Sequence, residues 1–347
     1  MDSFYGIMLF ALAGLVSAGF YTPLKYVKWS WEIMWIFYAL VACLAAPMIM
    51  ASIAIPSCWQ AIGKTEFDVL VQTFIYGALW GVGGLTFGLS MRYLGIGLGT
   101  AVALGFCALV GTLIPPLKEG RLLEIASDRH GLTVLIGVFI CALGIAINGV
   151  AGMLKEKDSI QGEKAENSEF SLVKGFAVAI VAGVLSAGMS LSMDCGKPIA
   201  EVARNIACAQ GLDSARANLF QNSAILIVTL TGGFLTNFIW CVFLAFKNGS
   251  FGDFKKTGAF KNIGFLILCA LGGLLWYCQF FIYGMGQTKL PQAYAFASWA
   301  ILMAFIIVFA GIIGLAIGEW KGTSKLTKAV LLLGILVLAS STFVMSI

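Results

Sequence analysis

Long apolar runs separated by short polar segments make up most of this chain. A helix needs roughly 20 predominantly apolar residues to cross the hydrocarbon core of a bilayer. Runs of about this length can be drawn at 4–22, 32–55, 69–90, 94–116, 131–152, 173–193, 217–246, 263–286, 290–317 and 327–346. The pattern therefore predicts an all-α membrane protein of about ten transmembrane helices.

The most polar stretch of the chain lies near its middle and separates five predicted spans from five. It runs from Leu154 to Ser171, carries charges of both signs and has no apolar helical face. If the halves are duplicates, an odd number of spans in each requires the second half to have the opposite orientation. We therefore expect two inverted five-helix repeats, at 1–153 and 173–347, joined by a polar cytoplasmic linker at 154–172.

Two internal sequence matches support the duplication. The residues Gly14–Gly19 (GLVSAG) correspond to Gly183–Gly188 (GVLSAG), and Leu79–Trp80 corresponds to Leu275–Trp276. The matches occur in the same order in both halves, as a duplication requires. Gly97, Ala101, Gly105 and Ala108 recur at helical spacing in the fourth span, and such a small-residue face predicts close packing against another helix.

Composition fits a chain whose solvent is lipid, with 60% hydrophobic and 11% charged residues in 347. Of the 22 Lys and Arg residues, 14 lie in loops that follow odd-numbered spans. The positive-inside rule then predicts that both termini face outward. The N-terminus has no cationic region, so we expect an uncleaved first helix rather than a signal peptide. The nine cysteines show no metal-ligand spacing, and we expect small buried hydrophobes and no metal site.

Acidic residues within spans are expensive, so the few present are candidates for function. Glu32 stands at the start of the second span, where it could carry a coupling proton or only complement the helix dipole. Asp194 ends the sixth span near Lys197, and we expect a structural ion pair there. His130, the single histidine, falls in a loop and is expected to be a solvated surface residue.

A polar and aromatic stripe in the eighth span is the best candidate for a solute site. Trp276, Gln279 and Tyr283 fall on one helical face, and Trp80 is the counterpart of Trp276 in the third span. Tyr294, Ser298 and Trp299 are expected on one face of the ninth span, where they extend the candidate site. Trp and Tyr also form interfacial belts. A mid-span glutamine, however, has no place in lipid and needs a polar partner or a cavity.

The chain resembles the L-rhamnose-proton symporter family of the drug/metabolite transporter superfamily over nearly its whole length. The likeness is carried by strings such as Lys28–Glu32 (KWSWE), Met91–Gly95 (MRYLG), Val110–Leu113 (VGTL), Ser186–Ser190 (SAGMS) and Gln279–Phe281 (QFF). The resemblance implies a ten-helix carrier in the bacterial inner membrane that imports L-rhamnose or a related sugar with a proton. Its partners would then be the sugar, the proton and the bilayer, with no cofactor and no nucleic acid.

The chain also departs from the family pattern as it is known to us. The pattern has polar residues where this chain has Gly84 and Thr86, a His in place of Gln287 and an Asp in place of Ala295. An exporter or an uncoupled carrier of another polar metabolite is therefore the alternative. The sequence has no phosphate-binding loop for ATP, no buried Ser and His pair for an intramembrane enzyme, and no filter sequence for a channel.

Overall fold

The computed structural model describes residues 2–160, 171–253, 255 and 258–346, and over those residues its regular secondary structure is helical throughout. Ten helical segments in the described part are long and apolar enough to cross a membrane. They are Ser3–Tyr26, Trp31–Ala54, Phe67–Leu94, Gly97–Lys118, Arg129–Asp158, Leu172–Ala209, Ser214–Asn248, Ala259–Gln287, Tyr294–Ala316 and Lys325–Val344. The predicted all-α, ten-span, multi-pass membrane protein is thus confirmed.

The chain forms two compact units, each assembled from separate stretches of sequence. Unit 1 contains Met1–Leu15, Val82–Leu191 and Lys289–Ile347, and unit 2 contains Val16–Gly81 and Ser192–Thr288. The chain therefore passes between the units four times: within α1 (Asp2–Gly19), α5 (Phe67–Leu94) and α10 (Gly188–Cys195), and between Thr288 and Lys289. Each unit takes residues from both predicted repeats, so the units are not the repeats, and the repeat boundaries stay a prediction.

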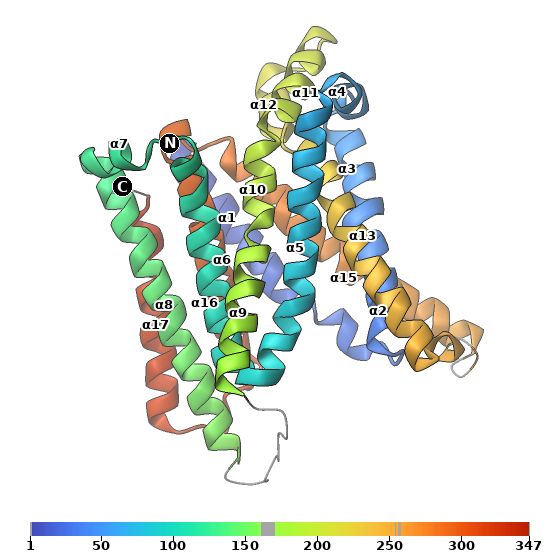
Figure 1. Ribbon diagram of the computed structural model, residues 1–347, viewed down its shortest axis with the longest axis vertical. Helices are drawn as coiled ribbons and strands as arrows, with labels where there is room; N and C mark the ends of the chain where they lie inside the picture. The colour runs from blue at the N-terminus through green and yellow to red at the C-terminus, as the bar shows by residue number, and fades with distance from the viewer. Residues whose placement is uncertain (1, 161–170, 254, 256–257, 347) are drawn as a thin grey trace. The chain divides into compact units, whose positions relative to one another are not determined.

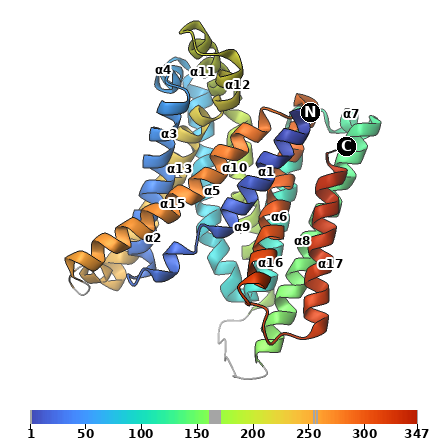
Figure 2. The same cartoon turned by 180° about the vertical axis from the view of Figure 1, so that it is seen from behind.

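Unit 1 is a bundle of long helices. Besides parts of α1, α5 and α10 it contains α6 (Ile96–Lys118), α7 (Leu122–Ser127), α8 (Arg129–Ile160), α9 (Leu172–Ser186), the 3-10 helix η4 (Gln292–Ala297), α16 (Ser298–Ala316) and α17 (Lys325–Val344). Helices α8 and α17 run side by side, and the terminal ends of α1 and α17 lie at the same end of the unit, near α7 (Figures 1 and 2). This end is where the cavity described below is found.

The small-residue face of the fourth span packs as predicted. A Cβ atom placed on Gly97 of α6 would lie 2.4 Å from the backbone of Gly152 on α8, and one on Gly149 would lie 2.1 Å from the Cβ of Ala101. Only glycine lets the two backbones approach so closely, because any side chain would occupy the other helix. The face is therefore a helix contact and not a binding surface.

The first residues of the predicted linker continue helix α8 instead of forming a loop. The helix extends to Ile160, and its last turns place two carboxylates against neighbouring helix starts. Glu156 accepts a hydrogen bond from the Gly97 backbone N–H at 3.0 Å. Asp158 accepts one from the Ser324 backbone N–H at 2.8 Å and so caps α17. These two contacts stabilise the helical conformation of the polar segment. The rest of the linker, at 161–170, lies outside the described residues.

Unit 2 holds the other helices whose bounds the described residues give. They are η1 (Pro23–Tyr26), α2 (Trp31–Leu40), the π-helical turn η2 (Val41–Ala45), α3 (Ala46–Ala54), α4 (Cys58–Lys64), α11 (Lys197–Ala209), α12 (Ser214–Phe220), α13 (Ser223–Asn248), η3 (Ser250–Gly252) and α15 (Ala259–Gln287), with parts of α1, α5 and α10. The wider η2 turn immediately precedes Pro47, whose ring cannot fit a regular α-helical ladder.

The long segment expected between the sixth and seventh spans is itself helical. Helices α11 and α12 pack together, with α4 beside α11, at one end of unit 2 (Figure 1). Ile199 and Ala203 of α11 are buried, and Ser57 donates a hydrogen bond to the Ala203 carbonyl at 2.9 Å. Lys197 and Asp194 form an ion pair, which confirms the structural role predicted for them.

Candidate solute site

The stripe predicted in the eighth span lies on helix α15, within unit 2. Trp276 is half-buried, Gln279 is 3% exposed and Tyr283 is fully buried. Their spacing of three and four residues places them on one face of the helix. The sequence placed these side chains correctly because the span is one uninterrupted α-helix from Ala259 to Gln287.

Trp80, on the part of α5 that belongs to unit 2, packs against Trp276. The two ring centroids are 5.4 Å apart with an angle of 30° between the planes. A Cβ on Gly233 of α13 would lie 2.4 Å from the Trp80 ring, so the glycine makes room for the indole. Tyr38 and Phe280 complete the aromatic cluster, each edge-on to Trp276 at 6.2 and 4.8 Å. The result is a rigid aromatic wall next to Gln279 on the same helix.

Three polar groups of this wall have no hydrogen-bond partner anywhere in the described residues: the Gln279 amide and the indole N–H groups of Trp80 and Trp276. Three other buried or half-buried tryptophans are partnered, whereas half-buried Trp320 contacts the Lys155 ammonium through its ring. Trp29 donates to Asn262 at 3.1 Å, Trp35 to Asn237 at 2.9 Å and Trp299 to the Cys107 carbonyl at 3.2 Å. None of the three groups is among the fully buried side-chain atoms that lack a partner in the described residues, which are the Thr112 and Tyr277 hydroxyls. Their polar atoms therefore stay accessible and can pair with water or with a bound solute.

Tyr283 differs from Gln279 because its hydroxyl is held by the protein. Gln287 donates to the Tyr283 hydroxyl at 2.9 Å, and Asn222 of the α13 N-terminus donates to the Gly284 carbonyl at 2.9 Å. Gln287 is one of the positions at which the sequence is expected to depart from the family pattern. In this protein its amide fixes the phenol at the end of the stripe.

Tyr294 and Ser298 lie in unit 1 and do not continue one face of a single helix. Tyr294 belongs to the 3-10 helix η4, whereas Ser298 begins α16 and is 1% exposed. The Tyr294 hydroxyl donates to Asp128 at 2.8 Å, while the Trp299 indole donates to α6. The expected common face of Tyr294, Ser298 and Trp299 fails because the tighter 3-10 winding changes the register before α16 begins.

Glu32, the candidate for proton coupling, is buried at the start of α2 in unit 2. Within the described residues it is the only buried Asp, Glu, Lys or Arg side chain. Asn248 donates to its Oε1 atom at 3.0 Å, and the Ser250 hydroxyl donates to the same atom. Both bonds go to Oε1, so a proton can be added at Oε2 without breaking either of them.

A polar network missed by the sequence analysis surrounds Glu32. Ser30, two residues before it, donates both its backbone N–H and its hydroxyl to Asp253, each at 2.8 Å. Asn248, Ser250 and Asp253 lie more than 200 residues from α2, in a segment whose composition is that of an ordinary polar loop. Only the fold brings them to Glu32. No group of three or more His, Cys, Asp or Glu side chains in the described part of the chain is placed to bind a metal ion.

Comparison with known proteins identifies the family to which this chain belongs. A family model described as L-rhamnose-proton symport protein matches residues 3–347. The chain belongs to this family. It is 38% identical over 338 residues to the L-rhamnose-proton symporters of Yersinia pestis (strain Pestoides F) and Yersinia pseudotuberculosis serotype O:1b (strain IP 31758), covering 95% of this chain and 94% of each relative. The relatives are named as transport proteins and not as enzymes, so the family resemblance drawn from sequence strings is confirmed.

Proposed function

We propose that this member of the family imports L-rhamnose or a closely related sugar together with a proton, across the bacterial inner membrane. The relatives at 38% identity carry that name. The observation that carries the proposal for this chain is Gln279, a 3% exposed side chain in mid-span whose amide has no hydrogen-bond partner in the described residues and is not sealed from solvent. A bound sugar hydroxyl would supply the missing partner.

The chemistry of the wall around Gln279 suits a monosaccharide. An amide both donates and accepts, so it can pair with a sugar hydroxyl in either sense. The two indole N–H groups, from Trp80 and Trp276, add donors, and the exposed part of the Trp276 ring offers an apolar face for the C–H side of a sugar ring. A methyl pentose has both kinds of surface. The site carries no charge, as a neutral solute requires.

Tyr283 orders the far end of the stripe, where Gln287 holds its hydroxyl. We assign it a positioning role, in which the fixed phenol limits how far a solute can extend along α15. Tyr294 and Ser298 belong to unit 1, and we keep both as proposed solute-binding residues. Tyr294 lines a separate cavity within that unit, and Ser298 is the first residue of α16.

Glu32 is proposed to carry the coupling proton. In its charged form the carboxylate accepts two side-chain hydrogen bonds at Oε1, from Asn248 and Ser250. Adding a proton at Oε2 removes the charge while the bonds to Oε1 weaken, because a neutral carboxyl is the poorer acceptor. Protonation would therefore loosen α2 from the end of α13. In an alternating-access cycle this change would favour one orientation of the carrier over the other.

Direct binding tests the proposed solute class. Purified protein in detergent is incubated with labelled L-rhamnose, and unlabelled methyl pentoses, hexoses and amino acids compete for it. We expect displacement by L-rhamnose and by sugars that share its hydroxyl pattern. No saturable binding of L-rhamnose, with binding of a labelled amino acid instead, would assign the carrier to a different metabolite.

A further inference from the structure

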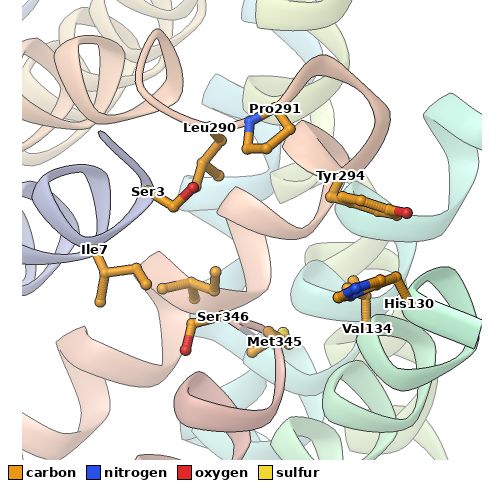
Figure 3. A pocket seen from close by; sticks show the side chains of 10 residues that line it. Ser3, Ile7, His130, Val134, Leu290, Pro291, Tyr294, Met345 and Ser346 are labelled. Carbon is orange, nitrogen blue, oxygen red and sulfur yellow. The ribbon is translucent and has the colours of Figure 1, made fainter. Parts of the chain in front are cut away.

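A small cavity lies within unit 1, apart from the residues of the α15 stripe. Its volume is about 190 Å³. The residues that line it are Ser3, Ile7, His130, Val134, Leu290, Pro291, Tyr294, Ile301, Met345 and Ser346. Figure 3 shows Ser3 and Ile7 on one side of the space and Tyr294 with His130 on the other. Leu290 and Pro291 lie above it, and Met345 and Ser346 lie below. The cavity is therefore bounded by α1, α8, the residues that follow α17, α16 and the segment before it.

The position of the cavity along the spans is set by where those helices begin and end. Ser3, Arg129 and Tyr294 are the first residues of three membrane spans, and Val344 is the last residue of a fourth. The lining residues thus sit at one membrane boundary of unit 1. The positive-inside rule predicts that this boundary faces outward, because the excess of Lys and Arg lies in the loops at the opposite ends of the spans.

The lining of the cavity is mixed in chemistry and contains no acidic side chain, while Asp128 is bonded to Tyr294 from outside the lining. Asp128 caps α8 by accepting from the Gly131 backbone N–H at 2.9 Å, and it also accepts from the Tyr294 hydroxyl at 2.8 Å. The second bond fixes the Tyr294 ring, which lies 6.2 Å from the His130 ring. The carboxylate therefore orients the Tyr294 ring.

Two polar groups that line the cavity are available to a ligand. Neither the Ser3 hydroxyl nor the His130 imidazole has a hydrogen-bond partner in the described residues. The imidazole can donate and accept, and the hydroxyl can do both as well. Ile7, Val134 and Ile301 provide apolar surface beside them. The cavity is smaller than the roughly 300–1,000 Å³ of ordinary ligand pockets, which restricts it to a ligand of few non-hydrogen atoms.

We propose that this cavity is an outer binding site that captures a neutral monosaccharide before it reaches the membrane-embedded site. The aromatic Tyr294 ring would stack on the C–H face, His130 and Ser3 would bond hydroxyl groups, and the apolar lining would take a methyl group. The proposal rests on the proposed function, since it assumes that the carried solute is a sugar. It assigns the only histidine of the chain and Tyr294 to capture of the solute from outside.

Uptake kinetics separate this capture site from the embedded site. Ser3→Phe would fill the cavity, and His130→Ala would remove a hydrogen-bonding group from an exposed position with little risk to folding. We expect both variants to raise the Km for sugar uptake about 3- to 10-fold, corresponding to one lost stacking or hydrogen-bonding contact, with Vmax unchanged. Tyr5→Ala is the matched control, because Tyr5 is exposed on the same helix as Ser3 and does not line the cavity.

The outcomes distinguish failure of the capture site from failure of the proposed function. Normal Km values in both Ser3→Phe and His130→Ala, with saturable uptake by the wild type, would overturn the capture site and leave the transport function standing. Absence of uptake of every tested sugar by the wild type would overturn the function. In that case, binding of L-rhamnose to the Gln279→Leu variant tests whether the cavity is a binding site. Binding that is abolished when Ser3→Phe is added to this variant supports the capture site, and absence of binding to the Gln279→Leu variant rejects it.

Discussion

The rings of Trp80 and Trp276 lie in contact, with centroids 5.4 Å apart, and neither indole N–H has a partner in the described residues. The sequence matches predict that these two residues are equivalent positions of the two repeats. Their rings touch, so no sugar can be inserted between them in this structure. A solute therefore has to use the remaining exposed surface of Trp276, beside Gln279.

Replacing Trp276 tests the role of this wall. Trp276→Ala removes the stacking face and one donor, and an aromatic contact contributes about 0.5–1.5 kcal/mol beyond its buried area. We expect the Km for sugar uptake to rise at least 3- to 10-fold. Trp240→Ala is the control, because Trp240 is 46% exposed on α13. Equal effects of the two substitutions would mean that Trp276 only stabilises the fold.

Gln279 carries the polar half of the proposed site. Gln279→Leu keeps the volume of the side chain and removes its amide, which costs one or two hydrogen bonds to the solute at about 1 kcal/mol each. We expect the Km to rise roughly 5- to 30-fold in initial-rate uptake measurements, with normal amounts of protein in the membrane. Gln72→Leu, the same change at an exposed position of α5, should be silent. Unchanged transport by Gln279→Leu would remove the stripe from the site.

If Glu32 carries the coupling proton, its replacement should abolish sugar accumulation but leave sugar exchange intact. Glu32→Gln keeps an oxygen that can accept from Asn248 and Ser250, but it cannot take up a proton. We expect loss of gradient-driven accumulation in vesicles, while exchange of labelled for unlabelled sugar continues. Glu66→Gln, at an exposed acid, serves as the control. Accumulation that persists in Glu32→Gln would leave this carboxylate with only its structural bonds to α13.

The α6 and α8 contact predicts a stability effect without any change in the solute site. In Gly97→Leu the new side chain would meet the Gly152 backbone, since even a Cβ atom lies 2.4 Å from it. Overpacking of this kind costs typically about 1–3 kcal/mol. We expect a lower midpoint of thermal unfolding in detergent. Gly264→Leu is the control, because nothing lies within 4 Å of its Cβ position. A similar midpoint in both variants would contradict the close helix contact.

The Asp128 cap predicts a pH dependence of stability. Hydrogen bonds from the Gly131 N–H and the Tyr294 hydroxyl lower the pKa of Asp128 from its ordinary value. The folded pKa lies below the unfolded one, so the stabilisation is complete above the ordinary pKa of about 3.9 and is lost as pH falls through the lower folded value. We expect the wild type to unfold at a higher temperature than Asp128→Asn by a constant margin between pH 7 and 5, and by a smaller margin below about pH 4. A margin that grows on acidification would be inconsistent with the cap.

The membrane spans and the α15 stripe were predictable from sequence because both follow from local periodicity. Ten apolar runs define ten spans, and a single helix fixes the common face of Trp276, Gln279 and Tyr283. The two compact units were not predictable, because the chain crosses between them inside helices α1, α5 and α10, where composition does not change. The pairing of Glu32 with Asn248 and Ser250, and of Tyr294 with Asp128, depends on contacts between segments more than 150 residues apart.

His130 illustrates the limit of such reasoning. As a lone histidine in a charged loop it is expected to be a solvated surface residue, and it is indeed exposed. The structure adds that the exposed ring borders a cavity and stands beside Tyr294. Neither the cavity nor the contact with Tyr294 can be predicted from the residues around His130 in the sequence. The cavity is formed by the ends of helices from the beginning, middle and end of the chain.

The most direct measurement is uptake of labelled L-rhamnose into cells that express this chain, with and without a protonophore. The proposed function predicts saturable uptake that competes with related sugars and collapses when the proton gradient is dissipated. Uptake that is unaffected by the protonophore would contradict proton coupling. Absence of L-rhamnose uptake, with transport of another polar metabolite, would contradict the assigned solute.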